Sequence, residues 1–329
     1  MSDGRCVFLT GATGFIGGRV AAILAGRGDR LRCLVRDAGR ARALETLGAE
    51  LVVGDVTDRA AHARGLEGAD VAVHLAAIYD IGVVDAAALY HTNIDGTAAF
   101  LDAVQSARTP RALYVSTTVA LGPVPAGIGD EATRNHPPYS SEYERTKTEA
   151  HSLALQAQQA GLPLIIICPA YVYGPGDNGP GGRFLRDLMR GRVPALLTGP
   201  AWFSFVHVDD VADGIVRALD QGGPGESYVL SGHDATINHF AQLATALAGV
   251  RGPLLRFPPP LALLTGRLLD GVARMTGARF AITAENVRTV SGHRWLHSHA
   301  KATAELGWQP RSLEAGLPET IAWLKTQGA

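Results

Sequence analysis

Short apolar runs rich in Val, Ile and Leu alternate with helical patterns through the first half of the chain, and this alternation restricts the fold more than any other feature. Strands that alternate with helices predict an α/β fold, with a doubly wound parallel sheet covered by helices on both faces. The predicted strands are Cys6–Leu9, Leu31–Val35, Leu51–Val53, Val71–Leu75, Ala112–Ser116 and Pro163–Cys168. The predicted helices are Phe15–Arg27, Arg40–Leu47, Arg59–Leu66, Ala86–Ala107 and Glu142–Ala160.

The pattern changes after Pro169, which indicates a second domain. Residues 171–182 contain five glycines and two prolines, a composition typical of a loop. Strand patterns at Ser204–Val208 and Ser227–Leu230, on either side of a helical pattern at Asp209–Leu219, then predict a return to the sheet. We expect a discontinuous larger domain of residues 1–170 and 204–231, and a smaller, mostly helical domain of residues 171–203 and 232–329 over the carboxyl edge of the sheet.

Composition and charge favour a small-molecule ligand. Hydrophobic residues make up 47% of the 329 residues and charged residues 19%, which excludes a disordered chain. The 30 Lys and Arg balance 31 Asp and Glu without forming a basic run, so nucleic acid is not an expected partner. Cys6, Cys33 and Cys168 lie inside apolar runs, which is typical of buried free thiols rather than of disulfides or metal ligands.

Two segments bear on the location of the protein. The N-terminal stretch MSDGRCVFLTG lacks the apolar region and small-residue cleavage site of a secretory signal, so a cytoplasmic protein is expected. The most apolar late stretch, Pro253–Leu269, is interrupted by Arg256, Arg267 and several prolines. Because a membrane span needs roughly 20 apolar residues in succession, no membrane span is expected.

Glycine recurs at every third position in Thr10–Gly17 (TGATGFIG), between the first predicted strand and the first predicted helix. Here Gly11 allows a tight turn, Gly14 lets a phosphate approach the backbone, and Gly17 lets the helix pack closely on the sheet. The helix N-terminus would then bind the pyrophosphate of a dinucleotide. A turn that merely tolerates glycine is the alternative, but the strand before it and the helix after it favour dinucleotide binding.

The end of the second predicted strand bears on which dinucleotide binds. Arg36 directly follows this strand, and Arg40 and Arg42 come soon after. Guanidinium groups at this place would bind the 2′-phosphate of NADP, whereas an acidic residue would bind the free ribose of NAD. NADP is therefore favoured. The alternative is that Asp37 binds the ribose and the arginines only form a solvated face.

Tyr143 and Lys147 lie four residues apart at the start of a predicted helix, so they are neighbours on one face. A nearby cation favours the phenolate and lowers the pKa of a tyrosine, which would let Tyr143 exchange a proton with a carbonyl oxygen. Such a pair also occurs by chance on many helices. The hydroxyl run Ser116–Thr118 supports the functional interpretation, because it follows another strand at the carboxyl edge of the sheet, where a substrate would lie.

Further motifs run in order along nearly the whole chain. They are TGATGFIG (10–17), GDVTD (54–58), HLAA (74–77), NIDGT (93–97), STT (116–118), YERTK (143–147), PAYVYGPGD (169–177) and FVHVDDVADGI (205–215). With this set the chain resembles the extended short-chain dehydrogenase/reductase superfamily, which includes the NAD-dependent epimerase/dehydratase family. The resemblance implies a Rossmann domain that binds NADP or NAD. It also implies a homodimer in which the predicted helices 86–107 and 142–160 pair across a two-fold axis.

The resemblance implies roles for individual residues. Thr117 would hydrogen-bond the substrate oxygen, Tyr143 would be the acid/base, and Lys147 would bind the nicotinamide ribose and lower the pKa of Tyr143. Thr118 competes for the first role, because the loop length leaves the register open. The implied cofactor-binding residues are Gly11, Thr13, Gly14, Phe15, Ile16, Gly17, Arg36, Asp55, Val56, Leu75, Ala76, Ala77, Tyr143, Lys147, Pro169 and Val172. The expected substrate-binding residues are Tyr79, Thr118, Tyr171 and Phe203, although ordinary packing would also explain the aromatic ones.

No metal site is expected. His207, Asp209 and Asp210 could suggest a metal or a proton relay, but their place at a strand-to-helix junction favours helix capping. The histidines of the second domain show no recognised ligand spacing. They are His233, His239, His293, His297 and His299.

Three functions follow from the resemblance. Within the superfamily, the sequence pattern most resembles that of dihydroflavonol reductases and 3β-hydroxysteroid dehydrogenases. This likeness implies an NADP(H)-dependent oxidoreductase that reduces a ketone or aldehyde of a mainly apolar small molecule, or oxidises the alcohol. Sugar-nucleotide epimerases and dehydratases typically have charged anchors where this chain has Ile165–Cys168 and Phe203–Ser204, so a diphosphate would lose its hydration without gaining partners. A catalytically silent NADP sensor is the third possibility, and the Tyr143–Lys147 pair argues against it.

Overall fold

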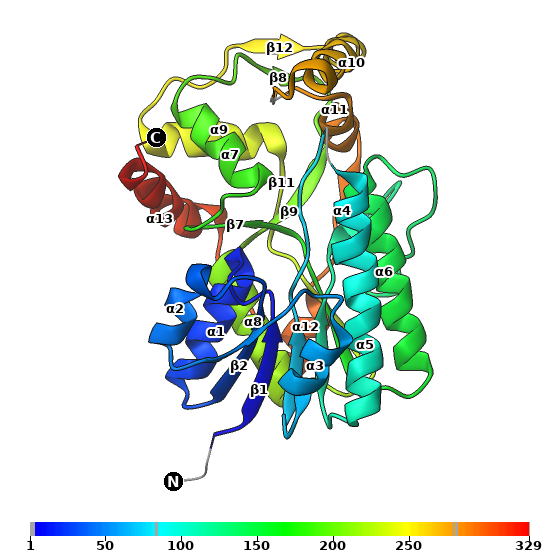
Figure 1. Cartoon of the computed structure of the whole chain (residues 1–329). Helices are drawn as coiled ribbons and strands as arrows, with labels where there is room; N and C mark the ends of the chain where they lie inside the picture. Colours follow the sequence, from blue (N-terminus) through cyan, green and yellow to red (C-terminus); the bar gives the residue numbers. More distant parts are fainter. Residues whose placement is uncertain (1–3, 83–84, 279, 281, 329) are drawn as a thin grey trace.

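Seven parallel strands form the main sheet of the structure, a computed structural model that describes residues 4–82, 85–278, 280 and 282–328. Their order across the sheet is β10–β6–β5–β4–β1–β2–β3 (Figure 1). The strands are β1 (Cys6–Thr10), β2 (Arg30–Val35), β3 (Glu50–Val53), β4 (Val71–His74), β5 (Ala112–Val115), β6 (Leu164–Pro169) and β10 (Ser227–Leu230). The predicted doubly wound α/β fold is therefore confirmed, because apolar runs that are buried on both faces pair in parallel.

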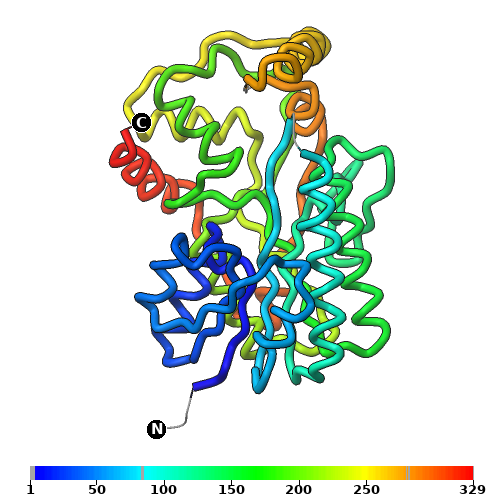
Figure 2. The backbone as a smooth tube through the Cα atoms, in the orientation of Figure 1, coloured from blue at the N-terminus to red at the C-terminus, as the bar shows by residue number. Residues whose placement is uncertain are grey.

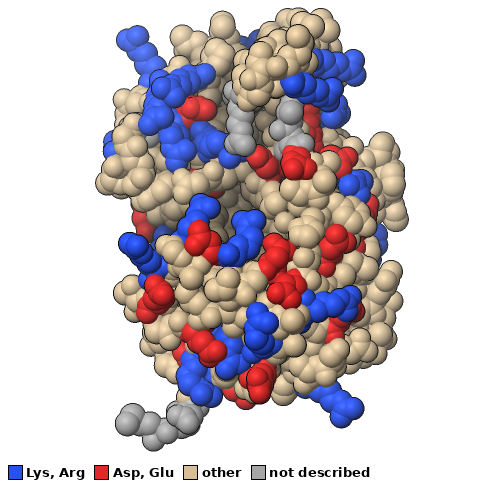
Figure 3. All heavy atoms as spheres, in the orientation of Figure 1, with Lys and Arg blue, Asp and Glu red and all other residues tan. Residues whose placement is uncertain are grey.

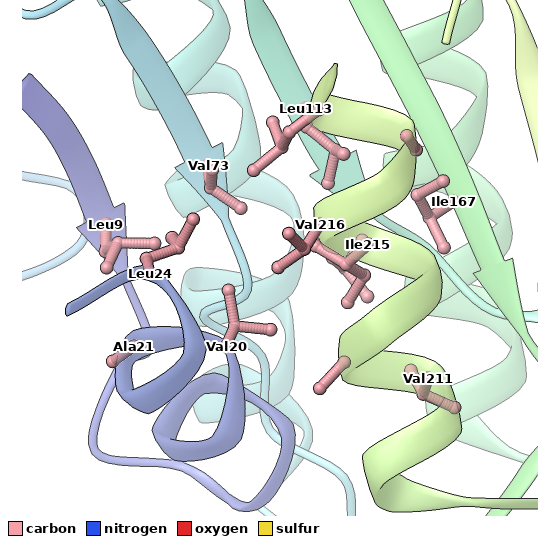
Figure 4. Close-up of a cluster of buried hydrophobic side chains, with 14 of the residues drawn as sticks. Leu9, Val20, Ala21, Leu24, Val73, Leu113, Ile167, Val211, Ile215 and Val216 are labelled. Atoms are coloured by element: carbon pink, nitrogen blue, oxygen red, sulfur yellow. The ribbon is translucent and has the colours of Figure 1, made fainter. Parts of the chain in front are cut away.

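Helices cover both faces of this sheet. One face packs against α1 (Phe15–Gly26), α2 (Arg42–Thr46), α8 (Val208–Gln221) and α12 (Ala300–Leu306). The other face packs against α3 (Arg59–Leu66), α5 (Gly96–Ala107) and α6 (Glu142–Gln159). Figure 4 shows the first of these cores, where Val73 of the sheet lies near Leu24 of α1 and Val216 of α8.

The second domain combines helices with short strands. β9 (Trp202–His207) pairs with β7 (Tyr171–Tyr173), β11 (His233–Thr236) and β13 (Arg294–Trp295), and β8 (Ala195–Leu197) pairs with β12 (Leu255–Phe257). The helices are α7 (Pro180–Met189), α9 (Ile237–Ala248), α10 (Pro259–Thr276), α11 (Ala284–Val290) and α13 (Leu313–Thr326). The glycine-rich stretch predicted as a loop thus begins with a strand, β7, which β9 holds in place.

The chain passes between the two domains more than once (Figure 2). It leaves the main sheet after β6, returns through α8 and β10, leaves again at β11 and returns at α12. Within the expected segment 204–231, α8 and β10 lie with the main sheet, whereas β9 lies in the four-stranded sheet. Among the described residues, no helix is long and apolar enough to cross a membrane.

Candidate active site

A cavity of about 1030 Å³ lies between the carboxyl edge of the main sheet and the second domain. The glycine loop and the first turn of α1 form one wall, and the first turns of α6 form another. The remaining walls come from α7, α10 and α11 and from the two sheets of the second domain, the four-stranded sheet around β9 and the pair β8–β12. The cavity therefore has two parts, a sheet-edge part that belongs to the first domain and a chamber that belongs to the second.

The glycine loop fits a pyrophosphate group. Gly11 has a φ of +73°, and a Cβ atom there would lie 2.5 Å from the backbone nitrogen of Ala76. Gly14 is the N-cap of α1 and offers no side-chain cap, and the first turn of α1 holds no acidic residue. Among the described residues, the N–H groups of this turn therefore have no side-chain cap, and together with the helix dipole they favour an anion.

The structure brings most of the expected cofactor residues to the cavity wall. These are Gly11, Gly14, Phe15, Ile16, Gly17, Leu75, Ala77, Tyr143, Lys147, Pro169 and Val172. Thr13, Arg36, Asp55, Val56 and Ala76 lie outside this wall.

Asp55 and Val56 follow β3 and are engaged within the protein. Asp55 accepts hydrogen bonds from the backbone and hydroxyl of Thr57 and from His91 Nε2, the last at 3.0 Å. Burial acts to raise the pKa of Asp55, but these hydrogen bonds outweigh it and hold the pKa below its usual value. Val56 is buried against Gly96 at the start of α5.

The end of β2 presents free cationic groups. Arg36, Arg40 and Arg42 are exposed, and none of them pairs with an acidic side chain in the described part of the chain. Asp37 is the N-cap of the short 3₁₀ turn Ala38–Arg40 and accepts a hydrogen bond from Gly39 N at 2.8 Å. One carboxylate oxygen of Asp37 is thus engaged in capping the turn, whereas the exposed guanidinium groups are accessible to a phosphate group.

Tyr143, Lys147 and Thr117 meet at the cavity wall. Ser141 caps α6 by accepting a hydrogen bond from Glu144 N at 3.0 Å, which fixes the turn that carries Tyr143. Lys147 Nζ donates to the hydroxyl of Tyr114 at 3.1 Å and to the carbonyl of Val115 at 3.3 Å, so β5 holds the ammonium in place.

The pKa of Tyr143 corrects one expectation. Burial raises the pKa of this phenol, while the Lys147 ammonium and a hydrogen bond with Thr117 act in the opposite direction. The expectation that Lys147 lowers the pKa of Tyr143 towards neutrality is therefore wrong for the net shift, although it gives the direction of the contribution from Lys147. Burial dominates because both groups are removed from water, and it lowers the pKa of Lys147 as well.

Thr117 and Thr118 both line the cavity. Thr117 caps the 3₁₀ turn Thr118–Ala120, and its hydroxyl accepts a hydrogen bond from Val119 N at 3.2 Å. Of the two, only the Thr117 side chain is in contact with the phenol of Tyr143 and acts to lower its pKa. This contact favours Thr117 as the hydroxyl that would share the substrate oxygen with Tyr143.

Asn93 helps to hold the backbone of Tyr143 through Thr146, a role that the sequence analysis missed. It lies in a π-helical turn, His91–Asp95, between α4 (Ala86–Tyr90) and α5, where a single regular helix was predicted. Asn93 Nδ2 donates to the hydroxyl of Thr146 at 3.1 Å, and that hydroxyl donates to the carbonyl of Tyr143 at 3.1 Å. The available signal was a polar Asn inside the NIDGT motif, within a segment predicted to be helical.

The chamber is mainly apolar and aromatic. The rings of Tyr79 and Tyr143 lie 4.8 Å apart, and those of Tyr171 and Phe203 lie 5.4 Å apart. Thus Tyr79, Thr118, Tyr171 and Phe203 all reach the cavity, as the expected substrate-binding residues would. Further apolar lining comes from Leu196, Leu197, Phe257, Ala262, Ala273, Val287, Val290 and Trp295.

Two charged groups on the chamber wall, Arg183 and Asp177, have partners within the protein. Arg183 Nη2 lies 2.7 Å from Asp80 Oδ1 in an ion pair. Asp177 accepts a hydrogen bond from Gly179 N at 2.8 Å, and burial raises its pKa. The positions where sugar-nucleotide enzymes carry anchors are Ile165–Cys168, buried within β6, and Phe203 on the cavity wall.

His207 and Asp210 have structural partners. His207 is the N-cap of α8, and its Nδ1 accepts a hydrogen bond from Asp209 N at 3.3 Å. Asp210 forms an ion pair with Arg311 at 2.8 Å. His207, Asp209 and Glu319 offer ligand atoms within 4.8 Å of one another. Arginines already face both of these carboxylates, however: Arg19 lies 3.2 Å from Asp209 and Arg311 lies 3.7 Å from Glu319.

Known proteins resemble this chain along most of its length. The model of the NAD dependent epimerase/dehydratase family matches residues 7–231. The sterol demethylase protein B of Methylococcus capsulatus is 32% identical over 327 residues, which cover 97% of this chain and 98% of that protein. A Synechocystis protein assigned as a dihydroflavonol 4-reductase is 28% identical over 334 residues, covering 98% and 95%.

Two further proteins resemble this chain, one by its structure and one by its sequence. The crystal structure of gox2253 superposes with a TM-score of 0.84 at 32% identity, covering 98% of this chain and 99% of that one. A protein of Mycobacterium tuberculosis named 3 beta-hydroxysteroid dehydrogenase/Delta 5-->4-isomerase is 26% identical over 325 residues, covering 92% and 86%.

Proposed function

We propose that this chain, which belongs to the NAD-dependent epimerase/dehydratase family, uses NADPH to reduce a ketone or aldehyde of an apolar small molecule, or NADP⁺ to oxidise the alcohol. As a member of the extended short-chain dehydrogenases/reductases it is an NAD(P)-dependent oxidoreductase. The observation that carries the proposal is the meeting of Tyr143, Thr117 and Lys147 at the junction between the glycine loop and the apolar chamber.

The geometry supports a simple division of labour. The glycine loop and the N-terminus of α1 would hold the phosphates of NADPH, which when bound would supply a hydride for the carbonyl carbon. Thr117 and Tyr143 hold the oxygen as it becomes an alkoxide, and Tyr143 gives its phenolic proton to complete the alcohol. Because burial keeps the pKa of Tyr143 high, the phenol retains this proton at neutral pH. Lys147 stabilises the phenolate that remains and makes the transfer less costly.

The chamber supports an apolar substrate rather than a sugar nucleotide. Its aromatic and aliphatic lining can bury a hydrophobic ring system, and Arg183, one of the cations on the cavity wall, is already paired with Asp80. Two relatives are named for a sterol and for a dihydroflavonol, which are both polycyclic molecules. Apolar polycyclic ketones are therefore the substrate class that we propose.

NADPH oxidation with a panel of cyclic ketones, aldehydes and UDP-sugars tests the proposal. We expect turnover with an apolar ketone, and a loss of about 10²–10⁴-fold in kcat in Tyr143→Phe, because the transferable proton is gone. The affinity for NADPH, measured by fluorescence titration, should change by no more than a few-fold. Tyr139→Phe is the matched control. Tyr139 is not among the residues that line the cavity, so this variant should keep full activity.

Two outcomes would overturn this function. Turnover of UDP-sugars without turnover of ketones would assign the chain to the epimerases. A sensor would be indicated if the wild type bound NADPH tightly but turned over no compound of the panel, so that it was as inactive as Tyr143→Phe.

A further inference from the structure

The helix α10 carries an apolar stripe on its outer face. The stripe consists of Leu261, Leu264, Leu268, Val272 and Met275, all of them exposed and spaced three or four residues apart. Met275 is 88% exposed. The neighbouring Leu254 and Leu255, before and at the start of β12, are exposed as well, Leu254 at 90%. Apolar side chains grouped in this way on a surface mark a binding face rather than scattered exposure.

The opposite face of α10 forms the roof of the chamber. Ala262, Gly266 and Ala273 are its buried residues, and Ala262 and Ala273 line the cavity. A Cβ atom at Gly266 would lie 2.6 Å from Ala284 N, so α10 packs closely on α11. One helix thus separates the apolar chamber from the apolar stripe.

Cationic side chains lie on α10 itself, at Arg267 and Arg274, and near Leu254 and Leu255 in the chain, at Arg251 and Arg256. Arg251, Arg256, Arg267 and Arg274 are exposed, and none of them pairs with an acidic side chain among the described residues. The single acidic residue between positions 251 and 278 is Asp270, which turns inward and accepts a hydrogen bond from Ala284 N at 3.1 Å. Figure 3 shows Lys and Arg side chains on both sides of the uncharged surface at this end of the molecule.

We infer that the α10 stripe, together with Leu254 and Leu255, docks on the surface of an anionic lipid bilayer. An amphipathic helix with leucines on one face and arginines beside them binds such a surface by burying its apolar side chains among the lipids, while the guanidinium groups meet the lipid phosphates. This mode of binding requires no membrane-spanning helix, in keeping with the helices of the described residues.

The charges favour a bilayer over a second copy of the chain. Leu268 lies at the middle of the stripe and Arg267 adjoins it. If two stripes met with the helices antiparallel and a two-fold axis near Leu268, the flank that carries Arg267 would face the same flank of the copy, and like charges would oppose the contact. An anionic bilayer instead gives every one of these arginines a partner.

Docking of this face would place the chamber next to the hydrocarbon. This step rests on the proposed function: an apolar ketone dissolved in the bilayer could reach Tyr143 past α10 without crossing water. The docking itself does not depend on turnover, so it is tested separately from the chemistry.

Vesicle flotation of the full-length protein tests the docking. We expect binding to vesicles of 70% phosphatidylcholine and 30% phosphatidylglycerol, weaker binding to pure phosphatidylcholine, and loss of binding as NaCl is added. Leu264→Ser/Leu268→Ser should lower the partition coefficient about tenfold or more. Arg267→Glu/Arg274→Glu should lower it about tenfold or more on the anionic vesicles. The matched controls, the exposed Leu247→Ser on α9 and Arg30→Glu at the start of β2, should bind like wild type.

A site-specific label guards against misfolded variants. The three native cysteines are buried, so Met275→Cys introduces one accessible thiol for an environment-sensitive NBD dye. Its emission should shift to the blue with anionic vesicles, whereas the same dye on Leu247→Cys should not respond. An unresponsive label at position 275, or equal binding by wild type and both double variants, would overturn the inference. So would a halving of the solution mass in Leu264→Ser/Leu268→Ser, because the face would then be a contact between copies.

Discussion

At the scale of single residues, the site depends on how burial and charge compete. Tyr143 and Lys147 are both removed from water, which opposes the charged form of each, while Lys147 acts to lower the pKa of Tyr143 and Tyr143 acts to raise the pKa of Lys147. Their spacing along α6 can be predicted from sequence, but their degree of burial cannot, because it depends on β5 and on the second domain. This is why the sequence predicted the direction of the effect of Lys147 and not the net pKa of Tyr143.

Arg36 provides a test of cofactor choice at the same scale. Arg36→Asp should weaken NADPH binding about tenfold or more, because it removes a guanidinium–phosphate contact and adds a like charge. NADH binding should change by no more than a few-fold. Fluorescence titration of both cofactors measures the two constants.

The control for Arg36 is Arg30→Asp, an exposed arginine at the opposite end of the same strand. It removes the same charge from the protein and should leave both constants unchanged. If wild type binds NADPH and NADH equally, or if Arg36→Asp keeps a preference for NADPH, the phosphate is not held by this arginine.

At the scale of elements, the long apolar strands were predictable and the short ones were not. β6 is a run of buried aliphatic residues, a signal that depends on no partner. β7 and β13 span only three and two residues, and they exist because β9 offers them hydrogen bonds. The π-helical turn at His91–Asp95 likewise depends on a distant partner, since Asn93 bonds the backbone of Ile78. Neither kind of contact leaves a periodic pattern in the sequence.

The start of α1 carries a prediction about packing. A side chain at Gly17 would collide with the carbonyl of Gly11, so Gly17→Ala should push the loop away from the helix. We expect NADPH affinity to fall about tenfold or more and the melting temperature to decrease, because the phosphate contacts and the close packing are lost together.

Gly26→Ala in the same helix is the matched control. A Cβ atom there meets no atom of the described residues within 4 Å, so the substitution should leave NADPH affinity unchanged and stabilise the helix by about 0.5–1 kcal/mol. Titration and thermal unfolding distinguish the two variants. Unchanged affinity in Gly17→Ala would show that the loop tolerates displacement and that its tight turn does not hold the phosphates.

At the scale of the whole molecule, the superfamily and the fold class predicted from ordered motifs are confirmed. The glycine loop, Tyr143 and Lys147, which the motifs identified, line one cavity in the structure. They did not indicate which residues of the second domain close that cavity. The α10 stripe, for example, lies outside all of these motifs, and the apolar stretch Pro253–Leu269, which contains part of it, predicted only the absence of a membrane span.

The expected homodimer is a prediction at this scale. α5 and α6 lie side by side on one face of the main sheet (Figure 1), where Ala103 and Leu153 are partly buried and available for a further contact. Two copies of the 34.5 kDa chain should therefore elute as one species of twice that mass by light scattering. Leu153→Arg should return the mass to that of one chain, because it places a charge in the proposed contact. A single-chain mass for wild type at micromolar concentration would remove the prediction.

The position of β10 has a consequence for synthesis on the ribosome. β10 pairs with β6, yet β7, α7, β8 and β9 of the second domain and the helix α8 lie between them in the chain. While these elements are being translated, the apolar strand β6 has one edge without its partner, and an open edge of this kind invites pairing with another nascent chain. The nucleotide-binding sheet is therefore completed late in translation, after residues of both domains have left the exit tunnel, and fragments that stop before Ser227 should aggregate rather than fold.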